Sequence, residues 1–385
     1  MKILFVTQDM SLTGGIERII SIQANYWKRE KGYDVCILTC GGSISTSFFP
    51  LDKRITMRNV NAYMKKSILN RIPGIKSLRR LIETLGVYKS VINEESPTLI
   101  VSSMQGIDRY ILPIIIKKNK NIPLVGVNHV TLGMRSGKYE TRLLDKFRKK
   151  ISFVCQMILW NRYRAIVMLS KTDYYKISRY NCNALYIPNP IFLENLNVDM
   201  EQSRPNRIIM VGRLDYLKGQ DRLLTIWANL ASQNPNWILT FVGNGPYLLK
   251  LQEKVIKAKL QGRVEFIHNS KNIPNLLKDA SIFAFTSRVE SFGMVILEAF
   301  SCGLPVIAYD CENGPRDLIK DGFNGFLIRD GNFEEFQRKL QFLISSESLR
   351  KELGKNAIKY ANSFSVENIM LEWDKLFDRI IQLKI

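Results

Sequence analysis

Short apolar runs alternate with longer segments of helical periodicity along the whole chain. Runs in the first half predict strands near 2–7, 34–39, 98–102, 123–128, 165–169 and 184–187. Runs in the second half predict strands near 207–212, 237–242, 263–267, 281–285, 304–308 and 325–328. Helical patterns lie between them, as in the helix expected from Ile16 to about Lys31. Strands that alternate with helices in this way form parallel sheets covered on both faces.

This pattern and the length of 385 residues predict an α/β protein with two doubly wound, Rossmann-like domains that face each other across a cleft. The polar stretch from Glu194 to Asn206, which contains Pro205, is the best linker candidate. We expect a first domain over 1–190 and a second over 191–365. Residues 366–385 predict a terminal amphipathic helix with an apolar stripe at Ile369, Trp373, Leu376, Phe377 and Ile380.

Composition narrows the class of protein. No apolar stretch is long enough to span a bilayer, and the apolar start at 3–6 is too short for a signal peptide. The six cysteines are scattered, which favours reduced thiols in a cytosolic protein, and two histidines make a multi-histidine metal site implausible. The net charge of +21 predicts an anionic partner: nucleic acid, an anionic membrane or a phosphorylated substrate.

Two glutamates stand out in the run from Ser287 to Ala299. Glu290 is expected on a loop at the carboxyl end of a strand, and Glu298 on the helix that follows. Ligands of open α/β sheets bind at this edge, and the backbone N–H groups of a helix start favour an anion. Two carboxylates beside such a helix start suit a sugar joined to a phosphate. A favourable interaction of a glutamate with the helix dipole would explain the same residues without function. The amides expected at this helix start are those of Phe292, Gly293 and Met294.

Two cations follow the first strand of the second half. Arg213 leaves the end of this strand, and Lys218 comes just before a predicted helix. An arginine fork and a lysine point charge together suit a diphosphate. The alternative is a solvated turn, which accounts for most loop arginines and lysines.

Three further positions at strand ends carry weaker signals. Gly15 lies in a glycine pair before the first helix, where a backbone can approach a phosphate closely. Gly243 lies in a turn after a strand, and His129 follows another strand end. A tight turn or a structural histidine explains each of them equally well. The pattern G-x-G-x-x-G is absent, which counts against a dinucleotide cofactor.

The order of these motifs resembles that of a retaining GT-B glycosyltransferase of glycosyltransferase family 4. The resemblance spans nearly the whole chain and is strongest from Ile208 to Leu327. The motifs that carry it include Val211-Gly212-Arg213, the Glu-x7-Glu run from Glu290 to Glu298, Ile187-Pro188-Asn189-Pro190, and Asp321-Gly322-Phe323-Asn324-Gly325.

The resemblance implies a GT-B fold whose terminal helix crosses back onto the first domain. It implies a nucleotide-sugar donor, retention of anomeric configuration, and no cofactor or metal. By similarity, Arg213 and Lys218 hold the donor diphosphate, Glu298 binds the ribose, Glu290 contacts the transferred sugar, and His129 lies beside that sugar. Donor binding also involves Gly15, Gly243, Phe292, Gly293 and Met294.

Two residues depart from the family pattern. His268 stands where glycine is usual, near the expected nucleobase pocket, and Arg288 stands where an apolar or aromatic residue is common. Both bear on the identity of the donor. UDP-sugars are the commonest donors of such relatives and are the expected choice here.

The acceptor side should be the strongly basic first domain. Apolar and basic residues are interleaved at helical spacing between Met64 and Ile82, and an apolar run from Ile151 to Trp160 has basic flanks. Such segments can lie on an anionic bilayer, although helices with solvated basic faces have the same pattern. Relatives build lipopolysaccharide, O-antigen or capsule on polyprenyl-diphosphate lipids, so the resemblance implies a lipid-linked glycan acceptor. It also implies a cytoplasmic protein, peripheral on the inner face of the cytoplasmic membrane. The acceptor and membrane candidates are Lys65, Lys66, Arg71, Lys76, Arg79 and Arg80.

The main hypothesis is therefore a metal-independent, retaining glycosyltransferase for bacterial surface polysaccharide. A GT-B nucleotide-sugar epimerase is the nearest alternative enzyme, and it would need no lipid acceptor. A basic nucleic-acid- or membrane-binding protein without catalysis is the alternative from another class. No nucleic-acid-binding motif is recognisable, so we expect no nucleic-acid partner.

Overall fold

The computed structural model describes residues 1–41, 46–60, 75–106, 108–116, 122–130, 153–181, 183–192, 199–268, 270 and 272–382, with the backbone alone for 75–81. The chain divides into two compact units. Unit 1 comprises Met1–Pro190 and Ile369–Ile385, and unit 2 comprises Ile191–Asn368. The roles that the sequence analysis gives to its two domains stay predictions.

Unit 1 contains a parallel seven-stranded sheet in the order β3-β2-β1-β4-β5-β6-β7. The strands are β1 Lys2–Thr7, β2 Asp34–Thr39, β3 Thr56–Asn59, β4 Leu99–Ser102, β5 Leu124–Asn128, β6 Ala165–Met168 and β7 Ala184–Tyr186. All but β3 were predicted. The sequence of β3 is Thr-Met-Arg-Asn, an edge strand with exposed Thr56 and Arg58, so it lacks the apolar run that identifies a buried strand.

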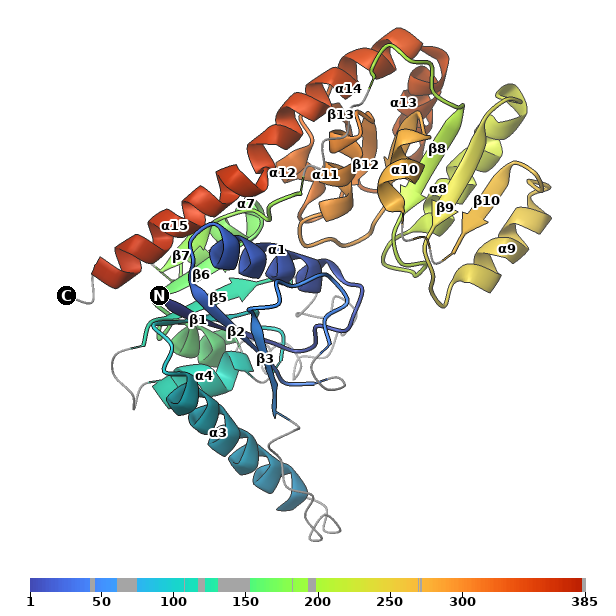
Figure 1. Ribbon diagram of the computed structural model, residues 1–385. Helices are drawn as coiled ribbons and strands as arrows, with labels where there is room; N and C mark the ends of the chain where they lie inside the picture. The colour runs from blue at the N-terminus through green and yellow to red at the C-terminus, as the bar shows by residue number, and fades with distance from the viewer. Residues whose placement is uncertain are drawn as a thin grey trace. The chain divides into compact units, whose positions relative to one another are not determined.

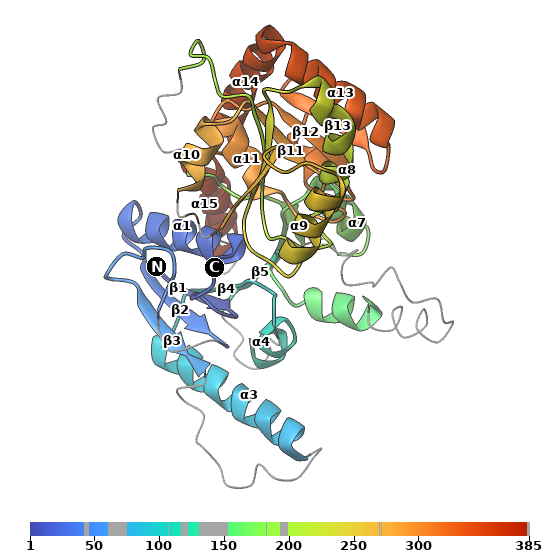
Figure 2. The ribbon, with the colours of Figure 1, turned by 90° about the vertical axis from the view of Figure 1, so that its right-hand side faces the viewer.

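The two faces of this sheet are covered by different helices. Leu4 and Val6 of β1 join one core cluster with residues of α3 (Ile75–Glu95) and α4 (Asp108–Ile116). Phe5 points to the opposite face and packs on Trp27 of α1 (Gly15–Arg29), with ring centroids 5.6 Å apart. Figures 1 and 2 show α3 and α4 on one side of the sheet and α1 on the other. The short helix α7 (Lys171–Ser178) lies between β6 and β7 in the chain.

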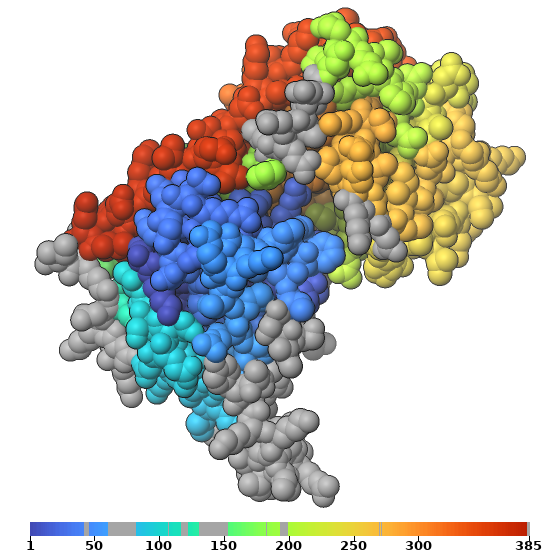
Figure 3. Space-filling view, in the orientation of Figure 1, coloured from blue at the N-terminus to red at the C-terminus, as the bar shows by residue number. Residues whose placement is uncertain are grey.

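The predicted terminal helix is present as α15 (Val366–Gln382), and from Ile369 on it belongs to unit 1. The Trp27 ring stacks on Phe377 at 4.8 Å and meets the edge of Trp373 at 5.8 Å. The indole N–H of Trp27 also donates to Asp374. The aromatic contacts and this partly buried hydrogen bond hold α15 beside α1, and Figure 3 shows the two helices packed together.

Unit 2 contains a parallel six-stranded sheet in the order β10-β9-β8-β11-β12-β13. The strands are β8 Arg207–Val211, β9 Ile238–Val242, β10 Val264–Ile267, β11 Ile282–Phe285, β12 Val306–Asp310 and β13 Gly325–Arg329. The helices are α8 Gln220–Leu230, α9 Leu248–Lys257, α10 Ile273–Lys278, α11 Met294–Ser301, α12 Pro315–Leu318, α13 Phe333–Ser345 and α14 Glu347–Ala361, with 3-10 turns η1 Ala231–Gln233 and η2 Asn362–Phe364.

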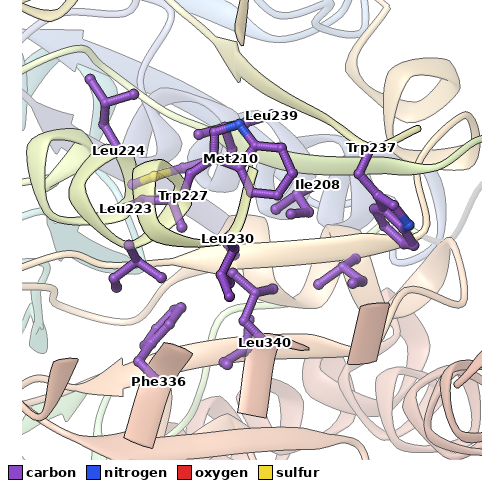
Figure 4. Close-up of a cluster of buried hydrophobic side chains, with 14 of the residues drawn as sticks. Ile208, Met210, Leu223, Leu224, Trp227, Leu230, Trp237, Leu239, Phe336 and Leu340 are labelled. Carbon is purple, nitrogen blue, oxygen red and sulfur yellow. The ribbon is translucent and has the colours of Figure 1, made fainter. Parts of the chain in front are cut away.

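One apolar cluster fills the space between this sheet and helices α8 and α13. Figure 4 shows Trp227 and Leu230 of α8 over Ile208 and Leu239 of the sheet, with Phe336 and Leu340 of α13 closing the cluster. All six strands predicted for this half are present. The predicted fold class is confirmed: both units are doubly wound α/β domains. In each the strand order reverses once, between β1 and β4 and between β8 and β11.

Candidate functional site

The best-defined cluster of candidate residues lies at the reversal of strand order in unit 2. Lys218 follows β8 and Glu290 follows β11, and these two strands are neighbours in the sheet. The Lys218 Nζ lies 2.6 Å from Glu290 Oε2, although the residues are 72 positions apart. The side chains retain 29% and 14% of their exposure, so the pair is half-buried but reachable. A carboxyl edge at such a reversal is where open α/β sheets bind ligands.

The electrostatics of this pair keep Lys218 charged. Burial acts to lower the pKa of Lys218, but the negative charge and hydrogen bond of Glu290, helped by Asp215, raise it overall. Lys218 is therefore a fixed cation across the physiological pH range. Asp215 Oδ1 also accepts from the backbone N–H of Lys218 at 3.0 Å, which shapes the turn before α8.

The two loops are fastened to each other behind the ion pair. Thr286 Oγ1 donates to the carbonyl of Gly219 at 2.8 Å, and the N–H of Arg288 donates to the carbonyl of Leu217 at 2.7 Å. Gly219 has φ +73°, and a Cβ there would overlap the Thr286 carbonyl oxygen. The close approach of two backbones therefore requires glycine, and it fixes where Lys218 stands.

Glu290 is also held from the side of α11. Its Oε1 accepts from the N–H of Ser291 at 3.1 Å, and its Cγ would lie 3.7 Å from a Cβ at Gly293. Gly293 has φ +89° and precedes α11, so the helix begins at Met294, two residues later than the predicted start near Phe292. Phe292 is buried with its ring toward Phe364. The N-terminus of α11 thus opens beside Glu290, as the sequence predicts.

The other donor candidates of unit 2 lie on neighbouring elements. Glu298 is half-buried on α11. Arg213 follows β8 with its side chain 71% exposed, 3.6 Å from Asp215, so it is free to reorient toward a ligand. Gly243 follows β9 with φ +141°, and a Cβ there would overlap the carbonyl oxygen of Gly212. The glycine therefore allows the loops after β8 and β9 to pack closely, and any ligand contact by Gly243 stays a prediction.

Arg288, one of the two departures from the family pattern, has a defined partner. Its guanidinium makes two hydrogen bonds to the Asp221 carboxylate, at 2.8 and 2.7 Å, and lies 4.0 Å from the centroid of the Tyr216 ring. Burial acts to raise the pKa of Asp221, but the hydrogen bonds and charge of Arg288 lower it overall. The arginine thus ties the β11 loop to the start of α8. His268, the other departure, is exposed after β10 and lies 3.2 Å from the carbonyl of Gly243.

Sequence analysis missed the residues that position this site. Thr286, Gly219, Asp221 and Asp215 contact the loops rather than any expected ligand. Only Asp215 had a local signal, an Asp three residues before the N–H that it caps. The others act across 67 residues of sequence, which no local pattern records.

In unit 1, Gly15 is the first residue of α1 and Gly14 its N-cap. Glu17 is 5% exposed and its carboxylate lies against Gly14, where a Cβ would overlap it. Burial raises the pKa of Glu17, backbone hydrogen bonds at Gly14 and Glu17 act against this, and the nearby charge of Asp9 adds to it. The buried Glu17 carboxylate therefore restricts which residue fits at Gly14, in addition to any requirement of the turn.

His129 follows β5, a neighbour of β4 at the same carboxyl edge of the unit 1 sheet. It is 7% exposed, and burial lowers its pKa from 6.5 to about 4. The imidazole is therefore neutral at physiological pH. It could accept or donate one hydrogen bond, but it would not offer a positive charge to a phosphate.

This pKa predicts how stability depends on pH. Below pH 6.5 the unfolded chain binds a proton at His129 that the folded protein does not bind until about pH 4, so stability falls with acidity in this window. Between about pH 7.5 and about pH 5, the free energy of unfolding should fall by roughly 2 kcal/mol more in the wild type than in His129→Gln. Urea unfolding at both pH values measures this. His268→Gln, which changes the exposed histidine, should behave like the wild type, and equal pH slopes in all three proteins would refute the burial of His129.

The basic candidates of unit 1 are only partly described. Lys65, Lys66 and Arg71 lie outside the described residues. Lys76, Arg79 and Arg80 fall in α3, where the structure gives their backbone alone. Their predicted contact with an acceptor or a membrane stays a prediction.

Two features are absent from the described part of the chain. No group of three or more His, Cys, Asp or Glu side chains in those ranges is arranged to hold a metal ion. No helix within the same ranges combines the length and apolar content needed to cross a bilayer.

Comparisons with known proteins agree with this arrangement. Residues 194–360 match the family described as Glycosyl transferases group 1. Over 384 residues the chain is 27% identical to the amylovoran biosynthesis glycosyltransferase AmsD of Erwinia amylovora, covering 98% of this chain and 99% of the relative. It is 23% identical over 383 residues to a Campylobacter jejuni α-1,4-N-acetyl-D-galactosaminyltransferase whose name specifies a diNAcBac-PP-undecaprenol-linked glycan, covering 99% of both chains.

A solved structure shows the same fold. Staphylococcus aureus TarM, determined in complex with UDP, superposes with a TM-score of 0.77 at 15% identity, covering 98% of this chain and 99% of TarM. The fold is therefore GT-B. The family match and the relatives together support a glycosyltransferase.

Proposed function

We propose that this protein is a retaining glycosyltransferase that transfers a sugar from a UDP-sugar to a lipid-linked glycan in the synthesis of bacterial surface polysaccharide. The observation that carries the proposal is the Lys218–Glu290 ion pair at the reversal of strand order in unit 2. It unites a cation for a diphosphate with a carboxylate for sugar hydroxyls at one sheet edge. The coarser class, a glycosyltransferase, already follows from the comparisons.

The chemistry requires positive charge where the leaving group forms. The bond between the anomeric carbon and the β-phosphate oxygen breaks, and negative charge grows on the nucleoside diphosphate. Lys218, Arg213 and the N-terminus of α11 would stabilise that charge, because all three follow β8 or β11. These charges take the place of a divalent cation in the proposal, so we expect full activity in the presence of EDTA.

The anomeric configuration is retained if the diphosphate departs and the acceptor attacks on the same face of the sugar. The acceptor oxygen bonds to the anomeric carbon, and its proton passes to the leaving phosphate oxygen. The transition state resembles an oxocarbenium ion. In this mechanism Glu290 orients the transferred sugar and is not a nucleophile, and Glu298 accepts from the ribose hydroxyls.

The choice of donor and acceptor rests on the relatives. TarM was determined with UDP, and the Campylobacter enzyme is named for an undecaprenol-diphosphate-linked acceptor. AmsD is named for biosynthesis of the polysaccharide amylovoran. We extend these to a UDP-sugar donor, an anionic lipid-linked acceptor and a place on the inner face of the cytoplasmic membrane.

A transfer assay tests the proposal directly. Purified protein is incubated in EDTA with UDP-, GDP- and ADP-sugars, with and without a polyprenyl-diphosphate-linked sugar. We expect release of UDP from one donor, increased by the lipid acceptor, and an α-linked product from an α-linked donor. Inversion of the anomer would refute the retaining mechanism, and absence of turnover and of nucleotide binding would refute the enzyme. Conversion of free UDP-sugar to its epimer would favour the epimerase instead.

Three helices of unit 1 expose apolar side chains to solvent. Helix α4 exposes Ile114 and Tyr110, α3 exposes Ile82, and the helical residues 153–160 expose Val154 and Ile158. The inward sides of these three helices join one core cluster, so all three cover the same face of the sheet. An apolar surface of this kind in a protein of charge +21 favours peripheral binding to anionic lipid.

This surface predicts how membrane binding responds to mutation. The double variant Ile114→Ser/Ile158→Ser should bind phosphatidylglycerol vesicles at least about ten-fold more weakly, because two apolar side chains no longer insert. Vesicle co-sedimentation measures the change. Ile256→Ser is the matched control, since Ile256 is 60% exposed in unit 2 and Ile158 58% exposed in unit 1. Equal vesicle binding by all the proteins would contradict membrane docking through this surface.

A further inference from the structure

A groove of about 460 Å³ lies in unit 1, lined by residues from the segment that leads from β2 into β3 and by Met57 of β3 itself, outside every candidate discussed above. Its lining contains Phe48, Phe49, Pro50, Leu51 and Met57, with Ser47 at one end. Phe48 remains 49% exposed, and its ring meets the edge of Phe49 at 5.2 Å. Phe49 is half-buried beside it, so the two rings form one aromatic patch at the groove, and contiguous exposed apolar patches can mark binding sites.

The loop that carries these rings is firmly anchored. The N–H of Phe48 donates to the carbonyl of Met10 at 2.8 Å. The Asn25 side chain of α1 donates to the carbonyl of Pro50 and accepts from the N–H of Asp52, at 2.9 and 2.7 Å. These hydrogen bonds fix the backbone of the loop that carries the rings, so less of the loop would need to be ordered when a ligand binds.

The lining chemistry fits a sugar ring. None of the described residues that line the groove carries a charge, so its floor suits a neutral group. The aromatic and proline faces can pack against the apolar C–H face of a pyranose. Ser47 donates its hydroxyl proton to the carbonyl of Phe49 at 2.7 Å, which leaves its oxygen lone pairs for a ligand hydroxyl.

The charges around the groove fit an anion attached to that sugar. Arg29 of α1 and Arg54 of the loop bind the single carboxylate of Asp52, and Lys53, between Asp52 and Arg54, is exposed. Hydrogen bonds from Arg54 and Arg29 lower the pKa of Asp52, so it stays ionised. Three cations against one carboxylate leave this end of the loop positive, as the diphosphate of a lipid-linked sugar requires.

The position of the groove connects it to the expected acceptor side. Met10, whose carbonyl holds Phe48, belongs to the loop after β1 that leads to Gly15 at the carboxyl edge of the unit 1 sheet. We infer that the Phe48–Phe49 groove is a subsite for a neutral sugar ring of the acceptor glycan. The inference rests on the proposed function, since it names where the acceptor of that transferase binds.

Saturation-transfer NMR on the full-length protein tests the inference. The probes are methyl glycosides of N-acetylgalactosamine, N-acetylglucosamine, galactose and glucose, together with farnesyl diphosphate and UDP. We expect transfer to the ring protons of at least one glycoside, reduced at least five-fold (about 1 kcal/mol) in Phe48→Ala. Phe48→Trp should retain the signal because it keeps an aromatic face.

Matched variants and probes separate the possible outcomes. Phe342→Ala, which removes a 51% exposed phenylalanine from unit 2, should leave the glycoside signal unchanged. An unchanged glycoside signal in Phe48→Ala overturns the inference, as does a signal lost from the farnesyl chain instead, which would make the groove a lipid site. If the protein binds UDP but none of the glycosides, the inference is overturned and the proposed function is not. Failure to bind UDP overturns the proposed function.

Discussion

Replacing Lys218 with alanine is expected to lower kcat for sugar transfer by about 100- to 1,000-fold, the usual cost of removing one group that stabilises developing charge. Lys218 Nζ lies 2.6 Å from Glu290 at the reversal of strand order, where its charge is fixed by its neighbours. In the proposed mechanism the leaving diphosphate would lose the half-buried cation of this pair. The variant would also leave Glu290 as an uncompensated carboxylate beside that diphosphate, which adds repulsion. Steady-state transfer with the UDP-sugar identified in the donor panel measures kcat and KM.

Three further variants show which property of Lys218 accounts for the loss of kcat. Lys250→Ala removes a lysine of unit 2 that lies 4.9 Å from the Tyr247 ring, and it should keep wild-type turnover. Lys218→Arg should recover part of kcat, since the charge remains but the geometry differs. Glu290→Gln keeps the shape of Glu290 without its charge and separates a role as charge partner from one as hydrogen-bonding orienter. Nearly full turnover in Lys218→Ala would rule out the proposed role of this pair.

The fold was predictable because its signals are local. Twelve of the described strands are largely apolar runs of three to six residues, and buried parallel strands have this pattern. Strand β3 was not predicted because an edge strand need not be apolar on both faces. The start of α11 was misplaced by two residues because Gly293, with φ +89°, ends the loop later than the apolar pattern suggests.

The sequence predicted the order of the site residues along the chain but not their contacts in space. Motifs placed Lys218 and Glu290 each at a strand end, but their 2.6 Å contact depends on β11 lying beside β8, which is a property of sheet topology. Arg288 shows the limit of family patterns. Its identity suggested an effect on the donor, which stays a prediction, and its two hydrogen bonds to Asp221 join the loop after β11 to the start of α8. That partner lies 67 residues away and could not be inferred from the local sequence.

A substitution at Gly219 should be the most damaging change that alters no ligand-binding side chain. Gly219→Ala would place a Cβ against the backbone carbonyl of Thr286, and backbone cannot swing aside as a side chain can. The φ of +73° adds strain of about 1 kcal/mol for any residue with a Cβ, and forced displacement adds about 1–3 kcal/mol. Urea unfolding should therefore show a total loss of roughly 2–4 kcal/mol. Turnover should also fall at least about ten-fold, because Lys218 is the preceding residue and misplaced catalytic groups lose rate steeply.

Gly262 provides the control that separates the cost of backbone strain from the cost of the overlap with Thr286. It has nearly the same φ, +74°, but a Cβ there would meet nothing within 4 Å. Gly262→Ala should thus lose about 1 kcal/mol of stability from backbone strain alone and keep full turnover. Equal losses in the two variants would mean that the contact between Gly219 and Thr286 does not hold the loops together. A Gly219→Ala protein that is destabilised yet fully active would show instead that Lys218 keeps its place without this contact, and that Glu290 alone is enough to position it.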